Sequence, residues 1–155
     1  ISACSPSGLP LSATARGKKF KACMLDIGLQ QCLCEVAVDV ALTQSNLLAI
    51  YNGQLAEQFV AQEMLAWQDS DLFYWARDAK SSSAEVDYLT VRGGEICPVE
   101  VKSGPGGRLK SLHLLLKTYP NCRQGLILYS GPYRELPEQK LTFLPLYCAG
   151  TIGEA

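Results

Sequence analysis

The chain has 155 residues and a net charge of −1, with 48% hydrophobic and 19% charged residues. This length suits a single domain with a substantial core, and the composition is typical of a globular protein. The small net charge argues against a protein that coats nucleic acid through bulk charge. The apolar runs are too short to span a membrane, and no segment has the pattern of a signal peptide.

The seven cysteines are odd in number and scattered along the chain. In a chain of this size they favour a reducing compartment over a disulfide framework, so we expect a cytoplasmic protein. Cys32 and Cys34 form the one tight pair, whereas a zinc site needs about four ligands at suitable spacing. Buried thiols that act as small apolar side chains are therefore the favoured interpretation, with zinc binding as a minor alternative.

The first third of the chain has a mixed character. Residues 2–12 are rich in Ser, Pro and Gly, so we expect residues 1–17 to be a flexible lead-in, in a piece of a longer protein that starts here at Ile rather than Met. Residues 18–26 predict a short strand that follows a basic run. An apolar stretch over residues 28–40 predicts a helix that residues 46–50 continue, and residues 51–53 predict a break.

Apolar residues then recur at helical spacing, which predicts an amphipathic helix over residues 53–67. Glu57 lies among the apolar positions of this helix. It is expected at the border of the buried face, looking toward a sheet, and an exposed helix glutamate is the alternative. Residues 72–75 are rich in β-formers and predict a first strand, and residues 77–83 predict a polar turn.

A β-hairpin is the central prediction of the sequence. Residues 85–89 and 98–103 both alternate apolar and polar side chains, and a Gly-Gly turn joins them as an antiparallel pair. Side chains two apart on a strand share a face, so Glu100 and Lys102 point the same way. Asp87 is expected on the neighbouring strand, close to Glu100. Two carboxylates and a lysine on one sheet face are energetically unfavourable unless they bind a cation or take part in a reaction.

The remaining segments complete an α/β pattern. Residues 108–119 predict a second helix, and the wholly apolar residues 124–130 predict a strand buried on both faces. Residues 141–147 predict a last strand at the edge of the sheet, because Pro145 cannot donate to a ladder. From residue 53 onward the predicted order is therefore helix, three strands, helix, strand, strand.

Charges are distributed unevenly along this part of the chain. Residues 52–89 hold seven acids against two bases, and residues 90–124 hold six bases against two acids. An acidic cluster for metal beside a basic rim for phosphate would fit this asymmetry. A solvated helix face explains Arg108, Lys110 and Lys117 equally well.

Asp87, followed thirteen residues later by Glu100-Val101-Lys102, resembles the PD-(D/E)xK nuclease superfamily. More narrowly, the chain resembles the DUF4143 domain found at the C-terminus of AAA+ ATPases. The segments that carry this resemblance are residues 21–29, 53–60, 74–77, 85–88, 98–104 and 119–120. It implies a restriction-endonuclease-like core over residues 52–150, with a mixed β-sheet flanked by helices. Residues 18–51 would then link this core to an ATPase module.

The resemblance also implies roles for individual residues. Asp87, Glu100 and the backbone carbonyl of Val101 would bind Mg²⁺ or Mn²⁺. Glu57 would complete or tune the metal site, and Lys102 would orient or deprotonate the attacking water. Hard carboxylate oxygens suit Mg²⁺, and phosphodiester hydrolysis needs stabilisation of extra negative charge, so this chemistry is physically consistent.

Other motifs are missing from the sequence. There is no G-x-x-x-x-G-K-[ST], so we expect no ATP site in this chain, and Val86 replaces the proline that usually precedes the aspartate. There is also no G-x-S-x-G, and His113 lacks an evident nucleophilic partner. The leading expectation is a metal-dependent nuclease-like domain that hydrolyses or binds DNA alongside an ATPase module. The alternative is a catalytically inactive regulatory or protein-docking module, which the slightly acidic balance favours.

Overall fold

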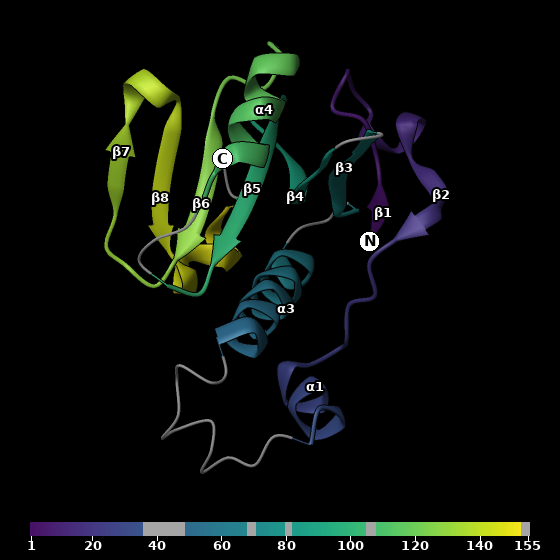
Figure 1. Cartoon of the computed structure of the whole chain (residues 1–155), viewed down its shortest axis with the longest axis vertical. Helices are drawn as coiled ribbons and strands as arrows, with labels where there is room; N and C mark the ends of the chain where they lie inside the picture. Colours follow the sequence, from purple (N-terminus) through teal and green to yellow (C-terminus); the bar gives the residue numbers. More distant parts are fainter. Residues whose placement is uncertain (36–48, 68–70, 80–81, 105–107, 153–155) are drawn as a thin grey trace.

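The computed structural model describes residues 1–35, 49–67, 71–79, 82–104 and 108–152. Within these residues, eight strands form one mixed sheet in the order β2-β1-β3-β4-β5-β6-β8-β7 (Figure 1). The strands are β1 (Ser2–Ala3), β2 (Arg16–Phe20), β3 (Phe73–Ala79), β4 (Ser82–Arg92), β5 (Glu95–Lys102), β6 (Gly125–Tyr129), β7 (Arg134–Leu136) and β8 (Leu141–Pro145). Strands β5, β6 and β8 run parallel, and β3, β4 and β5 are antiparallel neighbours.

The described helices are α1 (Ile27–Leu33), α3 (Ala49–Trp67) and α4 (Lys110–Thr118), with short 3₁₀ segments η1 (Leu11–Thr14), η2 (Pro137–Gln139) and η3 (Leu146–Thr151). The predicted order of helix, three strands, helix and strand is confirmed. Asp26 caps the N-terminus of helix α1, because its carboxylate accepts hydrogen bonds from the backbone N–H groups of Gly28 and Leu29. None of the described helices has the length and hydropathy that a membrane crossing requires.

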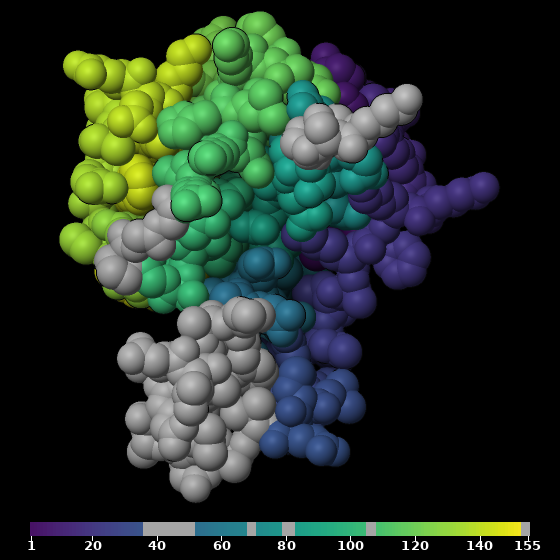
Figure 2. All heavy atoms as spheres, in the orientation of Figure 1, coloured from purple at the N-terminus to yellow at the C-terminus, as the bar shows by residue number. Residues whose placement is uncertain are grey.

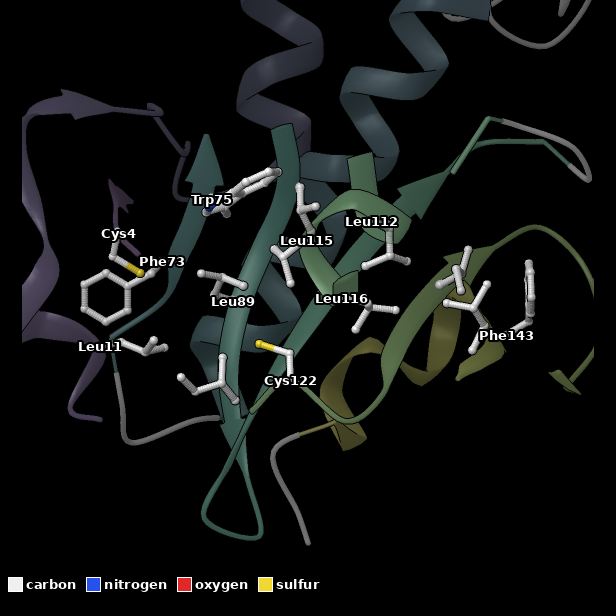
Figure 3. Close-up of a cluster of buried hydrophobic side chains, with 14 of the residues drawn as sticks. Cys4, Leu11, Phe73, Trp75, Leu89, Leu112, Leu115, Leu116, Cys122 and Phe143 are labelled. Atoms are coloured by element: carbon white, nitrogen blue, oxygen red, sulfur yellow. The ribbon is translucent and has the colours of Figure 1, made fainter. Parts of the chain in front are cut away.

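The sheet has a hydrophobic core on each face. On one face, Leu112, Leu115 and Leu116 of α4 pack over residues such as Leu89 of β4 (Figure 3). On the other face, Val60, Ala61 and Met64 of α3 pack with Val99, Val101 and Leu128 and with part of η3. Burying one such Leu or Val side chain contributes about 2 kcal/mol, so these two layers hold the sheet between α3 and α4.

The predicted hairpin is confirmed. Strands β4 and β5 pair antiparallel, from Arg92 opposite Glu95 to Tyr88 opposite Val99. Gly93 and Gly94 form the turn with φ of 55° and 78°, the left-handed conformation that glycine adopts without a Cβ penalty. Strand β6 is buried along its whole length, as its apolar sequence predicts.

Three expectations about element boundaries are wrong. Strand β8 is not at the edge, because β7 pairs with residues 141–143 of it, and Pro145 lies beyond that pairing. No break occurs at residues 51–53, since α3 already begins at Ala49. The polar turn expected over residues 77–83 is shorter, because pairing between β3 and β4 continues through Arg77 opposite Ala84. In each case, backbone hydrogen bonding continues past the point where the side-chain pattern predicts that the element ends.

The N-terminal segment also differs from the expected flexible lead-in. Strand β1 lies between β2 and β3 in the sheet, and Ala3, Cys4 and Leu11 are buried. Helix α1 confirms the beginning of the helix predicted over residues 28–40. The rest of that prediction falls on residues 36–48, which lie outside the described residues. Two stretches of the first 20 residues, β1 and β2, are therefore strands of the sheet.

Candidate functional site

The candidate site begins where the backbone pairing of β4 with β5 ends. Two residues beyond the pair of Tyr88 and Val99, the backbone N–H of Val101 donates to the Asp87 carboxylate at 2.8 Å. The pairing of β3 with β4 shifts register in the same region, opposite the segment from Phe73 to Trp75. Such a bulge re-aims side chains. Asp87 is consequently held in a fixed orientation and is only 8% exposed.

Glu100 and Lys102 form the second part of the site. They share a face of β5 as predicted, and the Lys102 ammonium lies 2.7 Å from Oε1 of Glu100. The side chain of Glu100 is 9% exposed and that of Lys102 is 26% exposed. The other carboxylate oxygen of Glu100, Oε2, is buried and has no hydrogen-bond partner within the described residues. A buried acceptor without a partner is destabilising, and it identifies a place where a ligand would be stabilised.

A lysine that the motif did not predict completes the cluster. The ammonium nitrogen of Lys21 lies 2.6 Å from Glu85 Oε1, 3.6 Å from Asp87 Oδ1 and 3.8 Å from Glu57 Oε2. These carboxylates come from β4 and from α3, and Lys21 comes from the segment that follows β2. The structure thus brings one cation of the chain among three carboxylates that are distant from it in sequence.

Aromatic rings and backbone contacts hold Lys21 in this position. Its ammonium lies 5.1 Å from the ring centroid of Tyr74 and 5.9 Å from that of Tyr88, within the range of cation–π attraction. Its backbone N–H donates to the carbonyl of Ile1 at 2.9 Å. Three residues later, Gln58 of α3 clamps Met24, accepting from its N–H and donating to its carbonyl. The lysine is therefore anchored on both sides of its position in the chain.

A hydrogen bond next to the cluster joins helix α3 to strand β4 of the hairpin. The hydroxyl of Tyr88 donates to the backbone carbonyl of Glu57 at 2.8 Å. The Glu57 side chain is 40% exposed and is oriented toward Lys21. The predicted helix glutamate is thus part of the cluster, and its closest cation is Lys21.

Burial governs the ionisation of these carboxyl groups. It raises the pKa of Glu100 to about 7, and the nearby Asp87 carboxylate adds to this effect while Lys102 opposes it. Burial likewise raises the pKa of Asp87, against the opposing effects of Lys21 and the Val101 N–H. Four carboxylates (Glu57, Glu85, Asp87, Glu100) face two ammonium groups (Lys21, Lys102), so the fully ionised cluster carries two excess negative charges. The site would therefore be stabilised by protons or by one divalent cation.

A family comparison places this site within a known domain. The model of the family described as Domain of unknown function (DUF4143) matches residues 52–149. The chain belongs to the DUF4143 family. Searches of curated proteins and of solved structures found no significant match. Glu57, Asp87, Glu100 and Lys102 all lie within the matched residues of the DUF4143 domain, and Lys21 lies outside them.

The donors in the DUF4143 domain suit a hard cation. Asp87 and Glu100 offer carboxylate oxygens. Because the N–H and C=O of a strand residue point toward the same neighbour, the Val101 carbonyl is directed to the side of Asp87. Over the described ranges, no three His, Cys, Asp or Glu side chains are grouped to hold a metal ion. A cation here would use two carboxylates, a carbonyl and water, a donor set that Mg²⁺ accepts.

A cleft gives access to the Lys21 side of the cluster. It has a volume of about 480 Å³ and lies between the N-terminal segment, α1, α3 and β4, with Lys21, Glu57, Glu85 and Tyr88 in its lining. Its lining combines these charged side chains with apolar ones such as Met24 and Leu33. Solvent and small ions can therefore reach the carboxylates of Glu57 and Glu85 from this side.

Basic residues lie on α4, the helix that packs on the other face of the sheet from α3. Lys110, His113 and Lys117 are exposed on α4, the helix whose outer surface forms the upper green part of Figure 2. The start of α4 is tied to the edge of the cluster, because the hydroxyl of Ser111 accepts a hydrogen bond from the backbone N–H of Glu85 at 3.4 Å. This hydrogen bond links the first turn of α4 to β4, the strand that carries Glu85 and Asp87.

Sequence reasoning missed Lys21 and Glu85 as site residues. One signal pointed toward them: residues 52–89 carry seven acids against two bases, and the nearest upstream basic run is residues 16–21. An excess of acid on buried elements requires countercharge from elsewhere in the chain. The pattern could not identify which base supplies it.

Proposed function

We propose that this DUF4143 domain is a metal-dependent, nuclease-like domain with a PD-(D/E)xK site on a restriction-endonuclease-like core. In this proposal it hydrolyses or binds DNA as the C-terminal domain of an AAA+ ATPase. The observation that carries the proposal is the buried Oε2 of Glu100, which has no hydrogen-bond partner among the described residues. The carboxylate of Asp87, which the Val101 N–H holds in place, is close enough to raise the pKa of Glu100. The two excess negative charges of the cluster would be balanced by the charge of one Mg²⁺.

Each residue would have a physical role in such a site. A bound Mg²⁺ would supply charge stabilisation for a phosphodiester and activation of water. Asp87 is oriented by the Val101 N–H, so its free oxygen needs little reorganisation to accept a cation. The Lys102 ammonium is partly exposed and bound to Glu100, which directs its positive charge to the place where phosphate oxygens would approach. Glu57 would adjust the negative charge from the side of α3.

A cleavage assay tests this proposal. The full chain is incubated with supercoiled, single-stranded and branched DNA in the presence of Mg²⁺ or Mn²⁺. Cleavage that Asp87→Ala and Lys102→Ala abolish, and that Arg134→Ala on the edge strand β7 retains, supports the enzyme. Absence of cleavage on every DNA form, together with absence of metal binding in calorimetry, overturns it.

A second candidate is a catalytically inactive regulatory or docking module. The observation that favours it is the Lys21 ammonium, which already neutralises part of the acidic cluster within the chain. In this case the charged cluster is a structural ion-pair network. Glu100→Gln would then change stability or affinity for a partner, with no cleavage to lose. Calorimetry with Mn²⁺ separates the candidates, because only the first requires a bound cation.

A further inference from the structure

We propose that Lys21 is a positioning residue that sets the cation affinity of the site, by acting as an internal cation that competes for Asp87. This inference rests on the proposed function, because it concerns the same site. Lys21 lies in the N-terminal segment, outside residues 52–149 that the DUF4143 model matches. The segment would thus control a site whose other residues all belong to the family domain.

The geometry around Asp87 supports the competition. One carboxylate oxygen, Oδ2, is taken by the Val101 N–H, and the other, Oδ1, lies 3.6 Å from the Lys21 ammonium. Oδ1 is therefore the oxygen that remains for a divalent cation, and Lys21 is the positive charge closest to it among the described ion pairs. A divalent cation that binds Oδ1 meets repulsion from Lys21 unless the ammonium moves.

Glu85 offers the ammonium an alternative position. Its Oε1 is the closest carboxylate oxygen to Lys21, at 2.6 Å, and Glu85 is exposed at the edge of the cleft. Lys21 can thus keep one ion pair while it withdraws from Asp87. The backbone anchors at Ile1 and Gln58 limit the movement to the side chain.

The buried Glu100 Oε2 is the independent observation that points to a ligand. It belongs to the residue that precedes Val101, whose N–H binds Asp87, and it has no hydrogen-bond partner in the described part of the chain. Lys102 engages only the other oxygen of Glu100. Lys21 therefore supplies charge to three carboxylates and leaves the fourth available for the cation.

Mn²⁺ binding by calorimetry on the full chain tests the inference. Lys21→Met should bind Mn²⁺ about tenfold more tightly or better than the wild type, because one nearby positive charge is removed. Lys21→Arg, which keeps the charge, should bind like the wild type. Lys19→Met is the matched control, since Lys19 is a neighbouring lysine that pairs with Asp78 on the surface.

The outcomes separate this inference from the proposed function. If folded Lys21→Met binds Mn²⁺ no more tightly than the wild type, Lys21 does not compete, and the metal site itself still stands. If neither protein binds Mn²⁺, the inference and the proposed function are both wrong. If Lys21→Met does not fold, an NMR titration of the wild type with Mg²⁺ tests the inference instead. The resonance of the labelled Lys21 ammonium should shift during the titration, and an unchanged resonance at saturating Mg²⁺ shows that Lys21 does not compete with the cation.

Discussion

The two lysines of the site come from regions that are built in different ways. Lys102 lies on β5, two residues from its partner Glu100, so the pair forms as soon as the strand does. Lys21 lies in the N-terminal segment and meets Glu57, Glu85 and Asp87 only in the folded protein. The ion pair of the hairpin is therefore formed by residues close in sequence, whereas the Lys21 cluster is formed by tertiary contacts.

This difference separates two tasks. The hairpin places Asp87, Glu100 and Lys102 with the geometry that a cation or a phosphate would use. The N-terminal segment, which lies outside the residues that the DUF4143 model matches, adds the positive charge of Lys21 to these groups. Substitutions in the hairpin should therefore remove function, whereas substitutions around Lys21 should tune metal affinity and stability.

The largest expected effect is on the hairpin. Asp87→Ala should lower any Mg²⁺-dependent DNA cleavage by about 100-fold or more, because general acid–base and charge-stabilising groups each contribute on this scale. Lys102→Ala should have a similar effect. Initial cleavage rates at saturating Mg²⁺ measure it, with Arg134→Ala on β7 as a surface control. Equal cleavage rates for Asp87→Ala and the control would show that Asp87 takes no part in the reaction.

The second prediction concerns pH. Glu100 has an ordinary pKa of 4.5, and burial raises this pKa to about 7 in the folded chain. Between these values the unfolded chain loses the proton first, so the folding stability of the wild type should fall as pH rises from 4.5 toward 7. The loss amounts to about 3 kcal/mol relative to Glu100→Gln.

Urea unfolding in EDTA at several pH values measures this loss. The Glu100→Gln variant is the control, because it keeps the shape of the side chain without a titrating proton. Mg²⁺ at pH 7 should restore wild-type stability in part. Parallel pH profiles for the two proteins would contradict the assignment of Glu100.

The third prediction concerns the Lys21 cluster. Lys21→Met should lower the free energy of unfolding by about 2 kcal/mol at pH 7 in EDTA, because it leaves three carboxylates without their common cation. Lowering the pH should recover part of this loss, since the carboxyl groups then become neutral. Chemical denaturation measures the effect, and Lys19→Met should leave stability unchanged. Similar losses for both lysine variants would place Lys21 among ordinary surface ion pairs.

The smallest expected effect lies at the clamp that holds the N-terminal segment. Gln58→Ala removes the two hydrogen bonds to the backbone of Met24 and should cost about 1 kcal/mol of stability. Because it loosens the segment without removing the Lys21 charge, it should change Mn²⁺ affinity less than Lys21→Met does. Calorimetry on both variants compares the two effects.

The hairpin could be predicted from the sequence because its signals are local. Alternation, the Gly-Gly turn and the spacing of Asp87 from Glu100 all act within about 20 residues. The Lys21 cluster could not be predicted, because it joins segments 36 to 66 residues apart, and no periodicity encodes such contacts. The strand β7 was missed for a related reason. It is three residues long, and its pairing with β8 rather than its sequence defines it.

A crystal structure of the chain soaked in Mn²⁺, with anomalous scattering recorded at the manganese edge, tests the metal site most directly. We expect one anomalous peak within ligand distance of Asp87 and Glu100, with the Lys21 ammonium displaced toward Glu85. An empty site between these two carboxylates at saturating Mn²⁺, with Lys21 unmoved, would contradict this expectation.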